Sequence, residues 1–532
     1  MRARRCSTVL ALLAAAFLTP RPVQADTLVV CTEASPDFLN PQLSTTSFDV
    51  GEQVFDRLLE IRTGGPELIP ALAQSWTISP DGLIYTFELR HGVHWQSNAR
   101  FTPTRTMNAE DVVFSFRRMF DKSDPFYQSA DGNFPEFTDL LEANLAAVEQ
   151  TSEDTVVFRL RKPSAPFLAA LSMGAFPILS AEYAAHLKAA GRPRDLDREL
   201  IGTGPFSFVH YQKDAVVRLR AFPQFWGRTG GQPDRAAKVN DLVFAITPNP
   251  SVRYAKLRTD ECQIARYPNP ADFPAMRANL DIRLLQAGIA ATNYIYFDTA
   301  KQPFDDKRVR RALAMAIDMP NLIRAVFQGS GTSAAALVPV ALWGHDPTLQ
   351  PYSHDPTAAK DLLTEAGYPS GFATELWAMP VVRPYMPNAR RAAEMIQSDW
   401  AKIGVQAKIV TYEWGEYLKR IRDGDSPAGI LGDIWDYPDP SEVMLEFVCG
   451  SAANAARFCN RDYDKAVQRA NIVTDRAERT RLYQQAQRII YDDVPLVRLA
   501  DVNAYVAVRR TVTGFTPHFL GPQPYGGVSL GK

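Results

Sequence analysis

The N-terminal segment of this chain limits every later interpretation of its fold. Three arginines at positions 2, 4 and 5 precede an apolar run over residues 9–18, which is too short to cross a bilayer as a helix. The tripeptide ending at Ala25 has the small-x-small pattern of a signal cleavage site. We therefore predict a secretory signal at residues 1–25, cleaved after Ala25, and an exported mature chain that begins at Asp26.

The exported chain is too long for one hydrophobic core, so two or more domains are expected. The whole sequence has 58 Lys and Arg against 59 Asp and Glu, and loss of the arginines of the signal leaves it mildly acidic. This balance argues against a nucleic-acid partner and against an anionic membrane surface. No later stretch has the roughly 18 unbroken apolar residues of a membrane helix.

Four cysteines follow the signal: Cys31, Cys262, Cys449 and Cys459. An even number in an exported chain indicates two disulfides. Of the three possible pairings, closeness in sequence favours Cys449–Cys459, which leaves Cys31–Cys262. A zinc site is disfavoured because the spacing is wrong and no pair of histidines accompanies the cysteines.

Helix and strand signals alternate along the chain, which predicts a sheet flanked by helices. Strands are expected at 27–31, 85–89, 155–160, 207–211 and 405–411, and helices at 108–120, 306–316, 318–328, 355–366 and 389–403. Asn108, Asp318 and Asp355 are candidate N-caps. Residues 202–206, Gly-Thr-Gly-Pro-Phe, predict a rigid turn. Without a long flexible linker, the domains are expected to be joined by short hinge strands.

The sequence motifs of common enzymes are absent. There is no Walker loop and no Gly-x-Ser-x-Gly elbow. His91 and His94 lack helical spacing and a third ligand, so surface or packing roles are favoured over metal binding. We expect no catalysis, no cofactor and no metal. A secreted hydrolase that uses carboxylates stays open as an alternative, because acids are plentiful.

Aromatic residues gather in the second half of the chain around two charges, Arg383 and Asp436. The aromatics are Trp377, Tyr385, Trp414, Trp435 and Tyr437. Aromatic walls with a few charged groups are typical of a small-molecule site, and a large aromatic core is the alternative. Three prolines around Arg383 predict an extended segment, and an arginine suits a carboxylate. Asp436 lies between two aromatics. If it is buried and no side chain of this chain pairs with it, a cationic ligand is the natural partner; the alternative is a solvated acid in a surface turn.

Long runs of this sequence are similar to a known family. These are residues 376–420, LWAMPVVRPYMPNARRAAEMIQSDWAKIGVQAKIVTYEWGEYLKR, and 251–272, SVRYAKLRTDECQIARYPNPAD. They resemble the family 5 peptide/nickel-type receptors of ABC importers, and the dipeptide receptors among them in particular. Shorter matches at 39–42, 70–73, 85–95 and 202–206 mark the family alone. Residues 101–111 look like a related receptor linked to antimicrobial-peptide resistance.

This resemblance implies an α/β, two-lobed periplasmic-binding-protein fold of type II, cluster C. The N-terminal lobe is expected over 26–285 plus 506–532, with an extra subdomain at about 61–180, and the C-terminal lobe over 286–505. The lobes would close on a short peptide in the periplasm, and the closed form, a monomer, would deliver it to an inner-membrane permease with separate ATPase subunits.

The resemblance also assigns residues. It implies that Asp436 binds the ligand amine, that Arg383 binds its carboxylate, and that Thr45 and Thr46 line the cleft. It supports the disulfides Cys31–Cys262 and Cys449–Cys459.

The loop around Asp436 departs from the family pattern. Trp435 and Tyr437 replace small residues, and Asp433 stands where the dipeptide receptors have a tryptophan. Haem, longer or antimicrobial peptides, or a peptide-like metabolite therefore stay open as other cargo.

Overall fold

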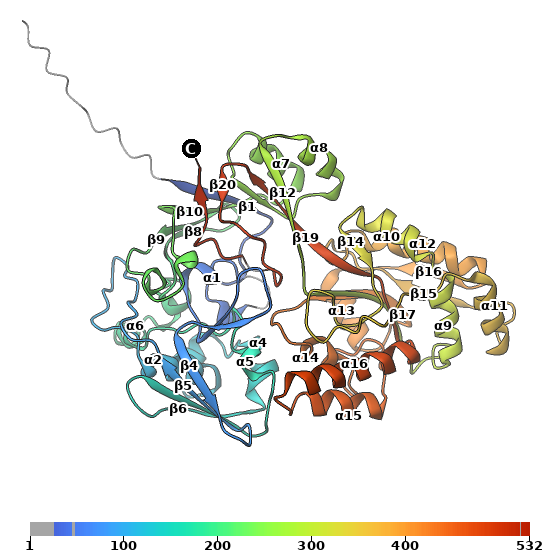
Figure 1. The fold of residues 1–532 in the computed structure, drawn as a ribbon, viewed down its shortest axis with the longest axis horizontal. Helices are drawn as coiled ribbons and strands as arrows, with labels where there is room; N and C mark the ends of the chain where they lie inside the picture. The colour runs from blue at the N-terminus through green and yellow to red at the C-terminus, as the bar shows by residue number, and fades with distance from the viewer. Residues whose placement is uncertain (1–25, 45–47, 522, 532) are drawn as a thin grey trace, which may run out of the picture.

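The computed structural model describes residues 26–44, 48–521 and 523–531. The expected signal peptide, with its cleavage site after Ala25, and the candidate residues Thr45 and Thr46 lie outside this range. The described chain forms two lobes side by side: an N-terminal lobe drawn mainly in blue to green, to which the red C-terminal strands return, and a C-terminal lobe drawn in yellow to red (Figure 1). None of its helices is both long enough and apolar enough to span a bilayer.

The N-terminal lobe is built on an eight-stranded mixed sheet. Its path runs β12-β19-β11-β1-β10-β9-β8, and β14 pairs with β19. The bounds are β1 (Thr27–Thr32), β8 (Phe206–Gln212), β9 (Val216–Ala221), β10 (Asp241–Ile246), β11 (Ile264–Arg266), β12 (Ile282–Gly288), β14 (Gly331–Ser333) and β19 (Ala500–Arg509). β1 lies parallel to β10 and β11, with Leu28 and Val30 fully buried. The strand expected at 27–31 is therefore confirmed as a central strand.

A second, antiparallel sheet of four strands lies in the same lobe, in the order β4-β5-β7-β6. Its strands are β4 (Ala73–Ile78), β5 (Ile84–Leu89), β6 (Leu145–Gln150) and β7 (Thr155–Leu160). Helix α2 (Ala109–Phe120) begins with a capping box, in which the Asn108 side chain accepts from Glu110 N–H and the Asp111 carboxylate accepts from Asn108 N–H. These elements fall within the expected extra subdomain, whose limits stay a prediction.

Short elements complete the N-terminal lobe. They are α1 (Gly51–Val54), β2 (Leu59–Ile61), β3 (Leu68–Pro70), α3 (Pro125–Ser129), α4 (Pro135–Phe137), a π-helical turn at Thr138–Glu142, α5 (Phe167–Ala170), α6 (Ala181–Ala189), α7 (Pro250–Arg258), α8 (Phe273–Ala278), β20 (Val512–Thr513), β21 (Ser529–Leu530), and 3-10 turns at Pro41–Leu43, Pro193–Asp197, Trp226–Arg228, Pro233–Arg235 and Pro270–Asp272.

The C-terminal lobe surrounds a five-stranded sheet in the order β16-β15-β17-β13-β18. Its strands are β13 (Ala291–Phe297), β15 (Ala373–Trp377), β16 (Gln406–Val410), β17 (Ala428–Ile434) and β18 (Leu496–Arg498). Its helices are α9 (Lys307–Ala316), α10 (Met319–Phe327), α11 (Pro356–Glu365), α12 (Ala389–Lys402), α13 (Trp414–Arg422), α14 (Ser441–Glu446), α15 (Arg461–Ala470) and α16 (Arg476–Asp493). The predicted N-caps Asp318 and Asp355 are confirmed, since their carboxylates accept from Asn321 N–H at 3.1 Å and from Ala358 N–H at 2.9 Å.

The chain passes between the lobes in short segments. β12 leads into β13 through Ile289 and Ala290, and β18 leads into β19 (Figure 1). A third link is the C-terminal segment, where Phe519 C=O accepts from Ala290 N–H at 2.9 Å. Phe519 packs in the core of the C-terminal lobe, whereas Tyr525 packs in the core of the N-terminal lobe. The exact lobe boundaries at 285/286 and 505/506 stay a prediction.

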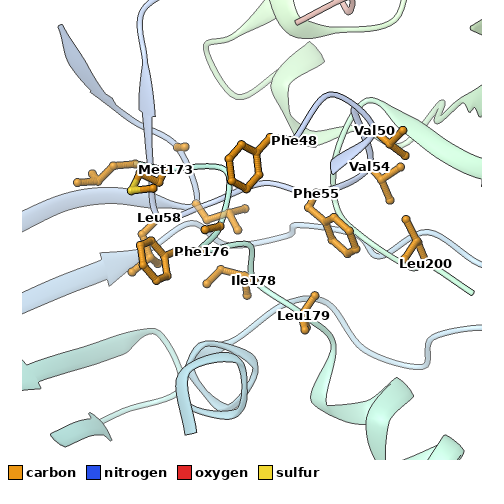
Figure 2. Packing of buried hydrophobic residues seen from close by; sticks show 14 of the residues in the cluster. Phe48, Val50, Val54, Phe55, Leu58, Met173, Phe176, Ile178, Leu179 and Leu200 are labelled. Carbon is orange, nitrogen blue, oxygen red and sulfur yellow. The ribbon is translucent and has the colours of Figure 1, made fainter. Parts of the chain in front are cut away.

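Buried apolar side chains form part of the core of the N-terminal lobe. Figure 2 shows Phe48, Phe55, Leu58, Met173 and Phe176 packed together, and each is at most 5% exposed. Burying a side chain of this size stabilises the fold by about 1.5–3 kcal/mol.

The turn predicted at 202–206 packs directly on this region. A Cβ on Gly202 would lie 2.0 Å from Val54 O, and a Cβ on Gly204 would lie 2.7 Å from Gln53 O. Neither position leaves room for a side chain, so the two glycines bring this turn into direct contact with the chain around Val54.

The structure pairs the cysteines as expected. Cys31 is bonded to Cys262, and Cys449 to Cys459, across Cα–Cα distances of 5.9 Å and 4.5 Å. The first disulfide ties β1 to the turn between α7 and β11 within the N-terminal lobe, and the second closes a short loop between α14 and α15.

Candidate functional site

The loop that carries Asp436 leaves the middle of the C-terminal sheet, directly after β17. Trp435 N–H donates to Ala290 C=O at 2.8 Å, which fixes the loop to the crossing segment. The Trp435 ring is 1% exposed in the core of the C-terminal lobe. Tyr437 is 4% exposed, but it packs with the buried cluster of the N-terminal lobe. Asp436 therefore lies where the two lobes meet.

Glu442, at the start of α14, holds the backbone of this loop. Its carboxylate accepts from Asp436 N–H at 2.7 Å and from Tyr437 N–H at 3.1 Å. The side chain of Asp436 is half-buried, and no described residue gives it a hydrogen bond or an ion pair. Burial raises the pKa of Asp436 well above its usual value, and the nearby Asp433 and Glu136 carboxylates raise it further. Asp436 therefore has no positively charged described residue in direct contact.

Other carboxylates from both lobes surround Asp436. Burial, followed by Asp139 and Asp433, raises the pKa of Glu136 in α4 to about 7. Loss of bulk solvent around its carboxyl raises the pKa of Asp433 to about 6. Burial, and to a smaller extent the Asp436 carboxylate, raises the pKa of Glu442. Burial, and to a smaller extent the Asp433 carboxylate, raises the pKa of Glu446. This concentration of acids produces a negative potential in the space between the lobes.

Arg383 is the cation whose charge opposes the rise in the pKa of Asp433. Its guanidinium lies 5.6 Å from the ring centre of Trp414 and next to the Tyr385 hydroxyl, and no described carboxylate is within ion-pair distance of it. Asp433 is thus in electrostatic range of both Arg383 and Asp436. The structure brings the two expected charges to one region and leaves each without an opposite charge in direct contact.

The segment around Arg383 is a tight turn, so the predicted extended conformation is wrong. Arg383 N–H donates to Met386 C=O at 3.2 Å, and Met386 N–H donates to Arg383 C=O at 3.0 Å. The reason is local, because Pro384 directly after Arg383 has the φ that the second position of a turn requires.

The candidate aromatic residues differ in their exposure. Trp377, Tyr385, Trp435 and Tyr437 are at most 4% exposed and pack in the cores, whereas Trp414 is half-buried beside Arg383. Direct ligand contact by the buried rings stays a prediction. Their observed role is to hold the segments that carry the two charges.

On its other side, Asp436 lines a cavity of about 40 Å³ together with the N-terminal lobe. Phe48, Gly174 and His518 line it, as does an ionic network centred on Arg57. Arg57 pairs with Glu52 and Glu60, all three being almost fully buried. Burial lowers the pKa of His518 to about 4. Sequence analysis missed this network, for which the i, i+3 spacing of Arg57 and Glu60 was the available signal.

Both candidate histidines, His91 and His94, are exposed. His91 is exposed and lies 3.3 Å from Asp154. Across residues 26–44, 48–521 and 523–531, no group of three or more His, Cys, Asp or Glu side chains is arranged to hold a metal ion.

Residues 67–455 match the family described as "Bacterial extracellular solute-binding proteins, family 5 Middle". Among curated proteins, the dipeptide-binding protein of Escherichia coli K12 is 44% identical over 96% of this chain and 95% of its own length. "Heme-binding protein A" of Haemophilus influenzae is 40% identical over 95% of this chain and 92% of its own length.

Solved structures have the same two-lobed fold. HbpA2 from Haemophilus parasuis superimposes with a TM-score of 0.89, at 39% identity, over 95% of this chain and all of that one. The dipeptide-binding protein from Pseudoalteromonas sp. SM9913 in complex with Met-Leu superimposes with a TM-score of 0.81, at 35% identity and the same coverage. This chain belongs to the family 5 bacterial extracellular solute-binding proteins.

Proposed function

We propose that this protein is the receptor of an ABC importer and that it captures dipeptides or other short peptides between its lobes. The observation that carries the proposal is the pair of uncompensated charges, the carboxylate of Asp436 and the guanidinium of Arg383. A short peptide is a zwitterion, so its two ends supply the two missing opposite charges. The dipeptide names of several relatives and the bound Met-Leu in one related structure support the same ligand class.

Binding would proceed by closure of the lobes on the ligand. The ammonium of the peptide pairs with Asp436, and its carboxylate pairs with Arg383 in a bidentate geometry. Asp433 lies within electrostatic range of Arg383, where it competes with the ligand carboxylate. A ligand that bridges the two lobes shifts the equilibrium between open and closed forms towards the closed form.

The setting of the receptor is part of this proposal. The chain would be cleaved after Ala25, act in the periplasm as a monomer, and deliver its ligand to an inner-membrane permease with separate ATPase subunits. It would bind and release its ligand without chemical change. Membership of a family of extracellular solute-binding proteins supports this setting.

A second candidate is other cargo on the same fold, such as haem or longer peptides. The 40% identity to Heme-binding protein A favours it, as does the replacement of small loop residues by Trp435 and Tyr437. Mass spectrometry and absorption spectra of whatever copurifies with the exported protein separate dipeptides, longer peptides and haem.

Calorimetry with modified ligands tests the charge assignment. Met-Leu is compared with its C-terminal amide and with its N-acetyl form, each of which lacks one charge. We expect both modified peptides to bind at least tenfold more weakly than Met-Leu, since each leaves one protein charge unpaired. Equal affinity of the amide and the free peptide refutes the role of Arg383, and equal affinity of the acetylated peptide refutes the role of Asp436.

A further inference from the structure

The two lobes make a direct contact that is separate from the strands joining them. Ala165 N–H, just before α5 in the N-terminal lobe, donates to Asn471 C=O at 2.8 Å. Asn471 directly follows α15 in the C-terminal lobe. In Figure 1, α5 faces the α14–α16 region across the gap between the lobes.

On the N-terminal side, the donor segment is fixed by β5. The Tyr85 hydroxyl donates to Ser164 C=O at 3.0 Å, and Tyr85 is 1% exposed. Ala165 lies in a turn in which Phe167 N–H donates to Ser164 C=O at 3.2 Å, and Pro166 after it disfavours a helical conformation of Ala165. The segment that carries the donor N–H is therefore tied to β5 and restricted by its own turn.

On the C-terminal side, a buried network joins the acceptor to the Asp436 loop. Asn471 Oδ1 accepts from the Tyr483 hydroxyl at 2.9 Å, and Arg479 Nη2 donates to that hydroxyl at 3.0 Å. Arg479 Nη2 also donates to Asp439 Oδ1 at 2.7 Å, and Asp439 accepts from Ser441 N–H at 3.0 Å. The described chain thus contains an unbroken polar path from Asn471 to the residues just after Asp436.

This path is rigid because its members are almost fully buried. Arg479 is 6%, Asp439 3% and Tyr483 0% exposed. Arg479 Nε donates to Ala470 C=O at 2.8 Å, and Trp343 Nε1 donates to Pro438 C=O at 3.0 Å. Satisfied buried networks hold one arrangement, since any displaced member leaves an unpaired charge. The Asp436 loop and the Asn471 turn therefore move as one body.

Tyr437 provides the second contact across the lobes. It belongs to the C-terminal lobe by its backbone, yet its ring packs in the buried cluster of the N-terminal lobe. It directly follows Asp436, so the residue proposed to bind the ligand amine and the residue that packs on the other lobe are adjacent in sequence.

We propose that Ala165, Tyr437 and the Asn471–Tyr483–Arg479–Asp439 network form a closure latch that engages when the Asp436 loop reaches the N-terminal lobe. The latch stabilises the closed form with or without ligand. Because the network joins the Asn471 turn to the Asp436 loop, a ligand held by Asp436 places the latch in its engaged position. The ligand part of this inference rests on the proposed function, whereas the latch contact itself does not.

Substituting the donor tests the latch without any ligand. Ala165→Pro removes the N–H, and Ala165→Ser keeps the N–H as the matched control. Spin labels are placed by Glu153→Cys and Ala477→Cys, exposed positions in the two lobes of a chain whose exported cysteines are all paired. Pulsed EPR then gives the ratio of closed to open molecules.

We expect Ala165→Pro to lower this ratio about 2-fold to 12-fold, the effect of one hydrogen bond, and Ala165→Ser to leave it unchanged. Tyr85→Phe removes the Tyr85 hydroxyl that donates to Ser164 C=O and preserves the ring. This variant should also lower the ratio of closed to open molecules. If Ala165→Pro does not fold, as judged by circular dichroism, Tyr85→Phe decides. A wild-type ratio in the folded variants overturns the latch.

Dissociation of Met-Leu, followed by stopped flow, gives a second readout. Ala165→Pro should accelerate release by the same factor and leave the association rate unchanged, because the ligand enters the open form. An unchanged release rate contradicts the latch. If the wild-type protein binds neither Met-Leu nor other short peptides, the proposed function fails, and the EPR measurement still decides on the latch.

Discussion

Asp436→Asn should weaken binding of Met-Leu by about 30-fold to 100-fold. Truncating one partner of a buried charge pair costs about 2–5 kcal/mol, and every 1.4 kcal/mol is tenfold in affinity. The lower end applies here, because Asp436 is half-buried and the neighbouring carboxylates Asp433 and Glu442 keep part of the negative potential. Titration calorimetry at pH 7 measures the change.

The same variant should stabilise the protein without ligand. Burial raises the pKa of Asp436 in the folded chain, so ionising this carboxyl opposes folding once the pH exceeds its unfolded value, near 4. The cost is fully present above the folded pKa and disappears at low pH. Asp436→Asn should therefore raise the melting temperature at neutral pH and change it little near pH 3.

Opposite signs for affinity and stability distinguish a ligand-binding acid from a structural one. Asp361→Asn, an exposed acid on α11, is the matched control and should change neither quantity. If Asp436→Asn binds Met-Leu within twofold of wild type, the amine-binding role is wrong. If it lowers the melting temperature at pH 7, Asp436 has a structural role that the described contacts do not explain.

Three further outcomes follow from the same structure. Arg383→Met should weaken Met-Leu at least tenfold in calorimetry but scarcely affect its C-terminal amide, and an equal loss for both ligands contradicts carboxylate binding. Gly204→Ala should destabilise the N-terminal lobe by about 1–3 kcal/mol in urea unfolding, because its Cβ would meet the Gln53 carbonyl oxygen at 2.7 Å; Gly65→Ala, with nothing within 4 Å, is its control. Removing Cys31–Cys262 by paired serine substitutions should cost about 2–5 kcal/mol, and unchanged denaturation curves would contradict that estimate.

Local chemistry determined the elements that sequence analysis predicted well. The helices after Asn108, Asp318 and Asp355 begin where a short polar side chain accepts from the first turn, a contact within three residues. The strand at 27–31 is a short β-rich segment, and it is central in the sheet. The turn at Arg383 was misjudged because proline restricts φ equally in extended segments and in turns, so its presence does not separate the two.

The residues of the candidate site likewise include some that the sequence indicates and some that it does not. Asp436 and Arg383 could be named because they interrupt apolar runs and match a family pattern. Glu136 and Glu446 could not be named, since nothing in their own segments indicates that they lie near Asp433 and Asp436. The spacing of Arg57 and Glu60 indicates an ion pair but not its place beside Asp436.

The sequence alone favoured the two disulfide pairings and predicted most helices and strands and the two charges of the candidate ligand site. Only the tertiary structure decided which lobe buries each side chain: Trp435 and Tyr437 are two residues apart, yet one packs in each lobe. It also decided that Ala165 meets Asn471, 306 positions away in the chain. The physical reason is that hydrogen-bonded caps and periodicity act over a few residues, whereas burial and charge pairing depend on segments that approach only once the chain has folded.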